Sequence, residues 1–247
     1  MKTATTFLFL LAFASTACAQ PCESVQCIDT LFRDIYSLKL SRASAVARVR
    51  EAHALLRSLN RKGGIERATS AAWVFPLRGH SARSIGGRGT GYRGAVSYDF
   101  FSGNSHGGHP AHDVFIRDRD FDDLDDKTSK PVDVLSVSAG IVISVTASWS
   151  PDSMDAKGRQ PIRSGICAWI YDPVSDCLFY YAHLRRAVCT VGQTVRPGDR
   201  LGEVGRTGKN AYPHRSPTHL HFMVLSFRDG LPTPRDIYPE LLRASTR

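Results

Sequence analysis

Thr218-His219-Leu220-His221-Phe222 is the stretch that decides how the rest of this 247-residue chain is interpreted. It runs on into the apolar residues 223–225, and such a run is typical of a β-strand. Side chains two positions apart in a strand leave the same face, so we expect His219 and His221 to lie side by side. Two such imidazoles are either a pair of metal ligands or one ligand beside a proton-transfer group, and two surface histidines are the simpler alternative.

A second histidine motif lies upstream, in His109-Pro110-Ala111-His112-Asp113. His109 and Asp113 are four positions apart, a spacing that returns to one face in a helical turn and in an extended strand alike. With one histidine of the downstream pair they would supply three zinc ligands and leave a fourth position for water, as in catalytic zinc sites. His106 and His112 are the alternatives to His109, and the spacing to Asp113 favours His109.

A third histidine, His183, lies in the aromatic stretch Tyr180-Tyr181-Ala182-His183-Leu184, which also has the character of a strand. A single histidine in such a stretch usually has a structural role. The presence of the two other histidine motifs favours instead a place for His183 in the same site.

In this order the motifs resemble those of the lysostaphin/LytM-type zinc endopeptidases. Between the HxxxD and HxH motifs the chain also has a strand-like run over Pro131–Val142 and a glycine-rich run over Val191–Gly208. The resemblance extends roughly from Trp73 to Phe227, and the ordered set is much more specific than either histidine motif alone. The sequence departs from the family pattern at Ala111, where glycine is usual, and by a long insertion before Ser216, and both departures bear on substrate preference.

The resemblance implies that His109, Asp113 and His221 hold one zinc ion per chain; spacing alone does not decide between the two histidines of the HxH pair. It assigns His219 and His183 to proton transfer or to stabilisation of the oxyanion. The chain has no HExxH motif to supply a glutamate base, and imidazole has a suitable pKa for that task. The implied reaction is hydrolysis of an amide in the peptide cross-links of peptidoglycan, so peptidoglycan peptides are the expected partner.

Two other functions stay open at this point. The first is a non-catalytic member of the same fold that binds peptidoglycan or activates another hydrolase, although such a member would be expected to lack ligands, and none is missing here. The second is a mononuclear iron oxygenase, because two histidines and a carboxylate also suit iron(II). Export to an oxidising compartment weighs against iron.

Residues 1–19 have the pattern of a secretory signal peptide, with a basic start, a short apolar run and the small-x-small site Ala17-Cys18-Ala19. The apolar run is too short to cross a bilayer, so no transmembrane segment is expected. We predict cleavage after Ala19 and export to the periplasm or cell envelope. Lipoprotein anchoring at Cys18 is the less favoured alternative, because the usual leucine three positions earlier is absent.

The chain carries a formal net charge of +9. Export argues against nucleic acid as its partner. Attraction to an anionic envelope polymer or membrane surface is one interpretation of the charge, and improved solubility alone is the other.

We expect three segments: the signal peptide, a helical N-terminal segment over residues 20–70, and the metallopeptidase domain over residues 71–247. Apolar residues recur at spacings of three and four within Asp29–Lys62, which predicts a helix or a helix pair that ends at Gly63-Gly64. Packing on the catalytic domain is the preferred role. Self-association through a coiled coil and autoinhibition over the site are the alternatives.

The rest of the chain predicts a mainly β fold, with an antiparallel β-sheet or β-sandwich-like metallopeptidase core beside the N-terminal helical segment. Residues 95–101 and 132–145 are strand-like, the latter with a bend at Ala139-Gly140. Cys167–Tyr171 and Leu178–Tyr181 are expected to form a hairpin across an Asp-Pro turn. The proline-containing C-terminal tail is expected to wrap the surface.

Five cysteines would remain after cleavage: Cys22, Cys27, Cys167, Cys177 and Cys189. In an exported protein they are candidates for disulfides. A Cys22–Cys27 bridge would close a small local loop, and two of the other three could pair around the turn over residues 172–176 and leave one odd thiol; the sequence does not settle the pairing. The aspartate-rich stretch Arg117–Lys130 lacks the glycine and the distal glutamate of a calcium loop, so we expect a solvated surface loop.

Overall fold

The fold is described by a computed structural model that covers residues 22–61, 73–87, 91–92, 94, 97–105, 107–152 and 163–247. The expected signal peptide and Cys18 lie outside the described residues, as do Gly63-Gly64 and His106. Among the described helices, none combines the length and the apolar character that a membrane crossing requires.

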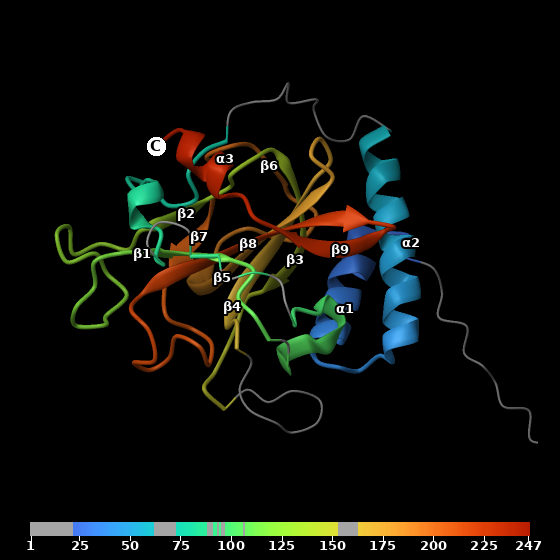
Figure 1. The fold of residues 1–247 in the computed structure, drawn as a ribbon, viewed down its shortest axis with the longest axis horizontal. Coiled ribbons are helices and arrows are strands. Elements are labelled where there is room, and N and C mark those ends of the chain that lie inside the picture. The colour runs from blue at the N-terminus through green and yellow to red at the C-terminus, as the bar shows by residue number, and fades with distance from the viewer. Residues whose placement is uncertain are drawn as a thin grey trace, which may run out of the picture.

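Nine strands in the described part of the chain form one sheet in which all neighbours are antiparallel (Figure 1). The central path runs β1-β8-β5-β4-β3-β6, while β7 pairs with β5 and β2, and β9 pairs with β8. The mainly β, antiparallel fold is therefore confirmed. The strands are β1 (His112–Phe115), β2 (Asp133–Leu135), β3 (Gly140–Thr146), β4 (Ile166–Asp172), β5 (Cys177–Ala187), β6 (Thr194–Val195), β7 (Arg200–Val204), β8 (His219–Arg228) and β9 (Leu231–Arg235).

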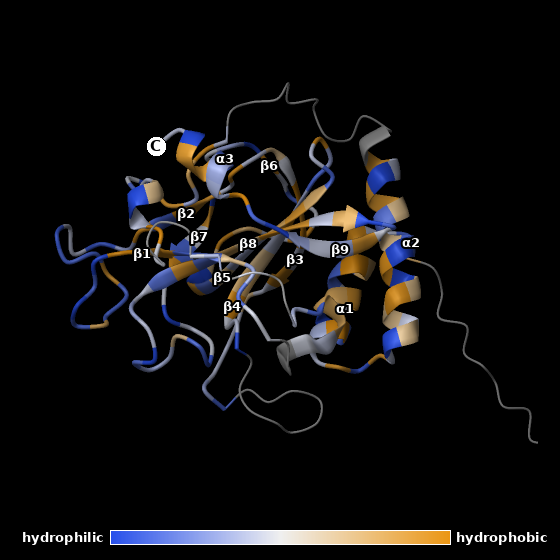
Figure 2. Cartoon of the chain, in the orientation of Figure 1, coloured by the Kyte–Doolittle hydropathy of each residue, from blue (hydrophilic) through white to orange (hydrophobic). Residues whose placement is uncertain are grey.

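Helices α1 and α2 pack on one face of the sheet, and α3 is a short helix near the C-terminus. They are α1 (Val25–Tyr36), α2 (Arg42–Arg61) and α3 (Tyr238–Arg243), with the 3-10 turns η1 (Ala82–Ser84) and η2 (Phe100–Ser105). Ser24 caps α1, because its hydroxyl accepts a hydrogen bond from the Cys27 amide. Leu38 has a φ of 57°, which lies outside the helical range, so the apolar stripe divides into two helices. Their apolar faces turn toward the sheet (Figure 2).

The two faces of the sheet belong to two hydrophobic clusters, as the alternation of side chains along a strand requires. In β5, Phe179 and Tyr181 belong to the cluster that includes Val114 and Phe222. The intervening Tyr180 belongs to the other cluster, which both N-terminal helices share with the sheet. This second cluster makes the helices part of the same packed body as the strands.

Three local features agree with the predictions from the sequence or depart from them. The β4–β5 hairpin is confirmed, with Asp172 opposite Cys177. The strand expected over residues 95–101 is wrong where it is described: Ser97 has a φ of 68°, and η2 begins at Phe100. The tail does more than wrap the surface, because residues 231–235 form an edge strand. Proline is tolerated there, because the outer side of an edge strand needs no amide hydrogen bond to a further strand.

The cysteines form one disulfide in the described part of the chain. Cys22 and Cys27 are bridged, whereas Cys167, Cys177 and Cys189 are buried free thiols. The second bridge that two of these three could have formed is absent from the described residues. Cys167 belongs to the cluster on one face of the sheet, and Cys177 and Cys189 belong to the cluster on the other, so Cys167 cannot reach either.

Candidate metal centre and the pocket beside it

Two neighbouring strands bring Asp113 and His221 together. Asp113 of β1 lies directly opposite His221 of β8, so their side chains leave the same face of the sheet. His109 lies on the segment that leads into β1, and its Nε2 is 3.1 Å from Asp113 Oδ2. His221 Nδ1 is 3.1 Å from Asp113 Oδ1. One ligand atom from each of the three residues lies within 4.8 Å of the others.

The hydrogen bond of His109 prepares this group for a cation. Its Nδ1 lies 3.0 Å from the carbonyl of Gly91, which can only accept, so Nδ1 carries the hydrogen. In the neutral ring Nε2 then turns a lone pair toward the Asp113 carboxylate, an arrangement that calls for a proton or a metal ion between them. A backbone carbonyl that orients a histidine in this way is the usual outer partner of a metal ligand.

The Asp113 carboxyl group is held as an anion. Burial raises its pKa, but the adjacent imidazoles of His109 and His221 outweigh burial when they are protonated and bring the pKa well below its usual range. The donor set of two imidazoles and one carboxylate therefore fits a zinc ion. This arrangement supports the predicted set of ligands, whose assignment stays a proposal.

His183 and His219 stand beside this group. Their ring centroids are 4.9 Å apart, and His219 Nε2 is 3.7 Å from Asp113 Oδ1. His183 Nδ1 donates a hydrogen bond to the Thr207 carbonyl at 2.8 Å, and His219 Nδ1 donates one to the Pro217 carbonyl at 2.7 Å. In the neutral rings each Nε2 therefore has a lone pair. Burial lowers the pKa of both rings, and for His183 the two other histidines of the group lower it further.

A bulge in β5 brings His183 to the correct face. Tyr181 and Ala182 lie opposite Phe222 and His221, so regular alternation would place residue 183 on the far side from His221. His183 instead has a φ of 62°, and β5 contains one more residue than β4 between the pairs Ala168–Tyr181 and Ile166–Leu184. The extra residue reverses the alternation. A non-glycine residue in this left-handed region is often found where function requires it.

The alternative ligands of the sequence analysis do not join the group. His112 follows alternation to the opposite face, where it is buried and lies 3.1 Å from an Asp236 carboxylate oxygen. His106 lies outside the described residues. The structure therefore brings His109, and not His112, to Asp113.

Sequence reasoning missed a buried arginine, Arg206, that follows β7 and bonds to the segment before β8. Arg206 donates to the Thr218 hydroxyl at 2.8 Å and to the carbonyls of Ala211 and Pro213 at 3.2 and 2.8 Å. Thr218 in turn donates to Asp118 at 2.6 Å. Asp118 is buried, so the predicted solvated loop over 117–130 is wrong at this residue. The position of Thr218, directly before His219, was the one signal that could have pointed to this network.

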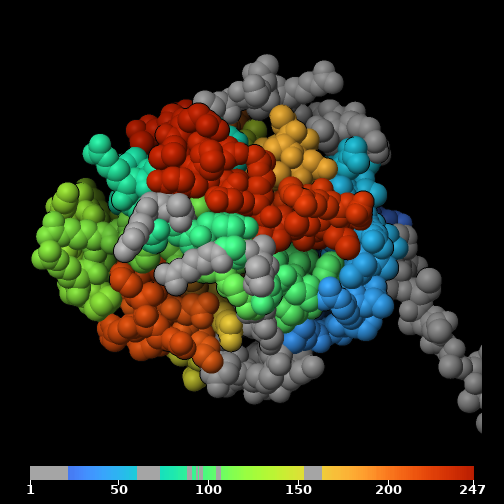
Figure 3. Space-filling view, viewed as in Figure 1, coloured from blue at the N-terminus to red at the C-terminus, as the bar shows by residue number. Residues whose placement is uncertain are grey.

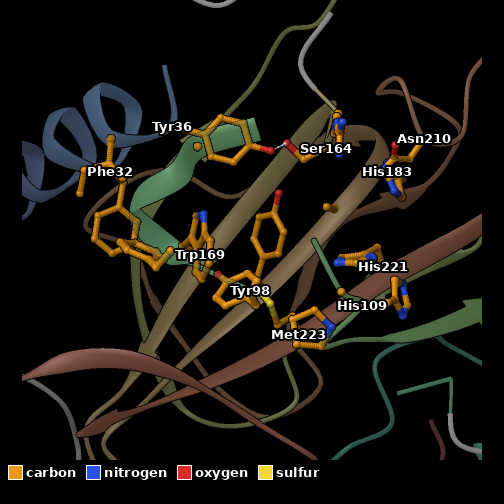
Figure 4. A pocket seen from close by; sticks show the side chains of 18 residues that line it. Phe32, Tyr36, Tyr98, His109, Ser164, Trp169, His183, Asn210, His221 and Met223 are labelled. Carbon is orange, nitrogen blue, oxygen red and sulfur yellow. Dashed lines mark hydrogen bonds between the residues drawn. The ribbon is translucent and has the colours of Figure 1, made fainter. Parts of the chain in front are cut away.

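Sequence reasoning also missed a cavity of about 110 Å³ that opens beside the histidines (Figure 4). His109, His183 and His221 line one part of it. The remainder combines aromatic side chains with the polar residues Arg163, Ser164 and Asn210, and it comes from α1, η2, strands β4, β5 and β8 and the loops beside them. These lining residues include Phe32, Tyr36, Tyr98, Phe100, Trp169, Tyr180 and Met223.

Residues 123–232 match the family model "Peptidase family M23". The matched stretch contains His183, His219 and His221, and it begins after His109 and Asp113. No curated protein matches the chain.

Two solved structures illustrate the similarity. The catalytic domain of lysostaphin from Staphylococcus simulans is 24% identical over 56% of this chain and 83% of its own, with a TM-score of 0.38. A zinc-containing peptidase from Vibrio cholerae is 18% identical over 72% of this chain and 41% of its own, with a TM-score of 0.37. The relationship to known proteins rests on the family match over residues 123–232, together with the ordered histidine motifs.

Proposed function

Since residues 123–232 match peptidase family M23, this chain is a relative of the lysostaphin/LytM-type peptidases, and we propose that it is an exported zinc endopeptidase. Its substrate would be an amide bond in the peptide cross-links of peptidoglycan. The observation that carries the proposal is the convergence of His109, Asp113 and His221, whose ligand atoms lie within 4.8 Å of one another. Two further imidazoles with free Nε2 atoms stand beside them.

His109 Nε2, the Asp113 carboxylate and His221 Nδ1 would hold the ion. When bound there, zinc would supply Lewis acidity toward the scissile carbonyl and make a water molecule acidic enough to ionise near neutral pH. The three protein ligands leave a position that solvent or substrate can reach, because all three side chains are partly exposed.

His183 and His219 would handle the protons. Their low pKa values keep both rings neutral at pH 7, so a neutral Nε2 accepts a proton as the attacking water adds to the carbonyl carbon. The protonated ring then donates to the leaving amine nitrogen as the carbon–nitrogen bond breaks. The other ring is placed to stabilise the negative charge that develops on the carbonyl oxygen.

Digestion of purified cross-linked muropeptides tests the proposal. Mass spectrometry should show new products that are one water heavier in total than the substrate. A chelator should abolish them and added zinc should restore them. A His221→Ala variant prepared in parallel should give none.

Intact substrate in the presence of zinc would contradict the proposal. If such inactive protein still bound sacculi, the non-catalytic peptidoglycan-binding function would replace it. Metal analysis of protein purified without chelators separates zinc from iron, and bound iron would favour the oxygenase alternative.

A further inference from the structure

A second cavity, of about 880 Å³, lies between the segment around η1 and the 117–130 loop. The end of β1 lines it between these two walls. Figure 3 shows the yellow-green 117–130 loop at one end of the molecule, with the teal segment around η1 next to it. We call this cavity the basic groove, because the cationic side chains that line it are Arg78, Arg117, Lys127 and Lys130.

The basic groove continues from the candidate metal centre along β1. Asp113, Phe115 and Arg117 alternate with two buried residues, so all three are on one face of the chain. Phe115 lies opposite His219, with ring centroids 5.2 Å apart, and it also lines the groove. Arg117 is four positions beyond Asp113, which is roughly 13 Å along an extended chain. A peptide whose amide lies at the metal centre can therefore reach the groove within about four residues.

Both walls of the groove are held in place. The Gly86 amide donates a hydrogen bond to the Asp113 carbonyl at 2.9 Å. A Cβ added at Gly86 would clash with the Phe115 ring, so this ring packs directly on the Gly86 backbone. In the opposite wall the Asp125 carboxylate accepts hydrogen bonds from the Thr128 amide and hydroxyl, at 3.1 and 3.2 Å. The groove is therefore formed before any ligand arrives.

The two carboxylates that line the groove are already engaged. Asp125 is buried and holds the turn of its own loop. Asp133 forms ion pairs with Arg78 at 3.0 Å and with Arg200 at 2.7 Å. The other aspartates of the 117–130 loop do not line the groove. No lining carboxylate is therefore available to neutralise the remaining cations.

Lys127 and Lys130 are the cations without a counter-ion. Both side chains are exposed, and within the described part of the chain neither forms an ion pair. Arg117, by contrast, is paired with Asp126 at 3.3 Å. A concave surface lined by charges of one sign raises the local concentration of a ligand of the opposite sign. The groove is therefore suited to an anionic group.

We propose that the basic groove binds a carboxylate of the peptide substrate, about two to four residues from the scissile amide, through Lys127 and Lys130. This inference rests on the proposed endopeptidase. The substrate itself is favoured over a separate anionic polymer, because Phe115 contacts His219 and also lines the groove. Ammonium groups on flexible stems are point charges that can follow a mobile carboxylate. The enzyme would thus prefer acidic cross-link peptides to amidated ones.

Two double variants of the full chain test the groove. Lys127→Gln/Lys130→Gln removes the two unpaired charges. Lys39→Gln/Arg57→Gln is the control, because it changes the net charge equally at two other exposed positions. Lys39 precedes α2 and Arg57 belongs to it, and α2 stands at the end of the molecule away from the 117–130 loop (Figure 1).

The substrates are one purified cross-linked muropeptide and the same muropeptide with its free carboxyl groups amidated. The readouts are kcat and KM at low and high salt, the affinity of the metal-free protein for both muropeptides by calorimetry, and its affinity for polyphosphate. Tm shows whether each variant is folded, and we expect it to stay at the wild-type value in both.

We expect the wild type to have a lower KM for the acidic muropeptide than for the amidated one. Lys127→Gln/Lys130→Gln should raise KM for the acidic muropeptide roughly fivefold, the value of two exposed ion pairs. Its kcat and its KM for the amidated muropeptide should not change. High salt should remove the difference between variant and wild type, because exposed charges are screened. The control variant should behave as the wild type does.

An unchanged KM of Lys127→Gln/Lys130→Gln for the acidic muropeptide would overturn the inference while the endopeptidase proposal stood. If that variant lost only affinity for polyphosphate, the groove would serve a separate anionic polymer and the inference would equally fail. An equal rise in KM in the control variant would overturn it too, because net charge alone would then explain the effect.

If the wild type cut neither muropeptide, the endopeptidase proposal would fail and calorimetry would decide the groove. Tighter binding of the acidic than of the amidated muropeptide, lost in Lys127→Gln/Lys130→Gln, would support the groove. Equal binding of the two muropeptides by the wild type, or no binding of either, would overturn it.

Discussion

His183 owes its place to a single backbone irregularity. The motif around it predicted a strand, but strand alternation alone would have turned its ring away from His221. The left-handed φ of 62° at this residue and the extra residue in β5 reverse its direction. No sequence pattern indicates such a bulge in an otherwise regular apolar strand. The approach of Asp113 to His221, by contrast, involves no irregularity, because both residues follow normal alternation along their strands.

The first prediction separates metal ligands from proton-transfer groups. His221→Ala should lose both zinc and activity, because it removes one of three protein ligands. His183→Ala should keep zinc and lower kcat by roughly a hundredfold or more, because it removes only a proton carrier. Metal content per chain and kcat are measured on the same preparations, with His80→Ala as a histidine control outside the site. Retention of zinc by His221→Ala at the wild-type level would refute the ligand assignment.

The second prediction concerns Asp123, whose pKa is raised to about 6, chiefly by burial and also by the neighbouring charge of Asp118. Arg206 opposes this shift without cancelling it. Because the folded pKa exceeds the unfolded value, the stability that this group contributes is complete below about pH 4 and is lost as the pH rises through about 6.

Asp123→Asn should therefore raise Tm more at pH 7.5 than at pH 4. Asparagine also tolerates the φ of 68° at this position. Thermal unfolding at the two pH values provides the measurement. An equal change in Tm at both would show that the carboxyl group does not titrate differently in the folded state.

At the scale of the elements, the sequence correctly predicted the helices and strands that depend on a local pattern of apolar residues. The β4–β5 hairpin has apolar strands on both sides of a turn, and the helical stripe between Asp29 and Lys62 has the correct period. The errors concern long-range packing: in the described part of the strand expected over 95–101, Ser97 is not extended and η2 begins at Phe100, where it packs on α1. The partner that η2 meets is distant in the chain, so periodicity could not reveal it.

The third prediction tests the Arg206 network that holds the segment before β8. Arg206→Met removes three hydrogen bonds of a buried guanidinium, so we expect a loss of about 3 kcal/mol in the free energy of unfolding. Activity should fall as well, because Thr218 precedes His219. Urea unfolding measures the loss, and Arg215→Met, an exposed arginine of the same segment, serves as the control. Equal stability of the two variants would contradict the role of Arg206.

The fourth prediction tests the anchor of α1. Asp29→Ala leaves the Val145 amide and the Ser144 hydroxyl of β3 without their acceptor, which should cost about 2 kcal/mol. The matched control is Asp34→Ala on the same helix, whose partner Lys39 is exposed, and its cost should stay below about 1 kcal/mol. Denaturant titrations of both variants decide the matter. If Asp34→Ala were the more damaging of the two, α1 would not be fixed to the sheet through Asp29.

At the scale of the whole molecule, the sequence predicted a mainly β core with helices before it, and the fold confirms that class. The sequence could not predict that these helices share one hydrophobic cluster with the sheet. Nor could it predict that α1 reaches the cavity beside the histidines. Both depend on how segments distant in the sequence meet. Export of the chain and attraction of its positive charge to an anionic envelope polymer remain predictions.

The central claim is that residues from two distant parts of the chain hold one zinc ion. An anomalous difference map at the zinc edge, from crystals of zinc-loaded protein, tests it most directly. We predict one peak at about 2.0–2.2 Å from His109 Nε2, an Asp113 carboxylate oxygen and His221 Nδ1. No peak among these atoms, or a peak bound instead by His183 and His219, would contradict the account.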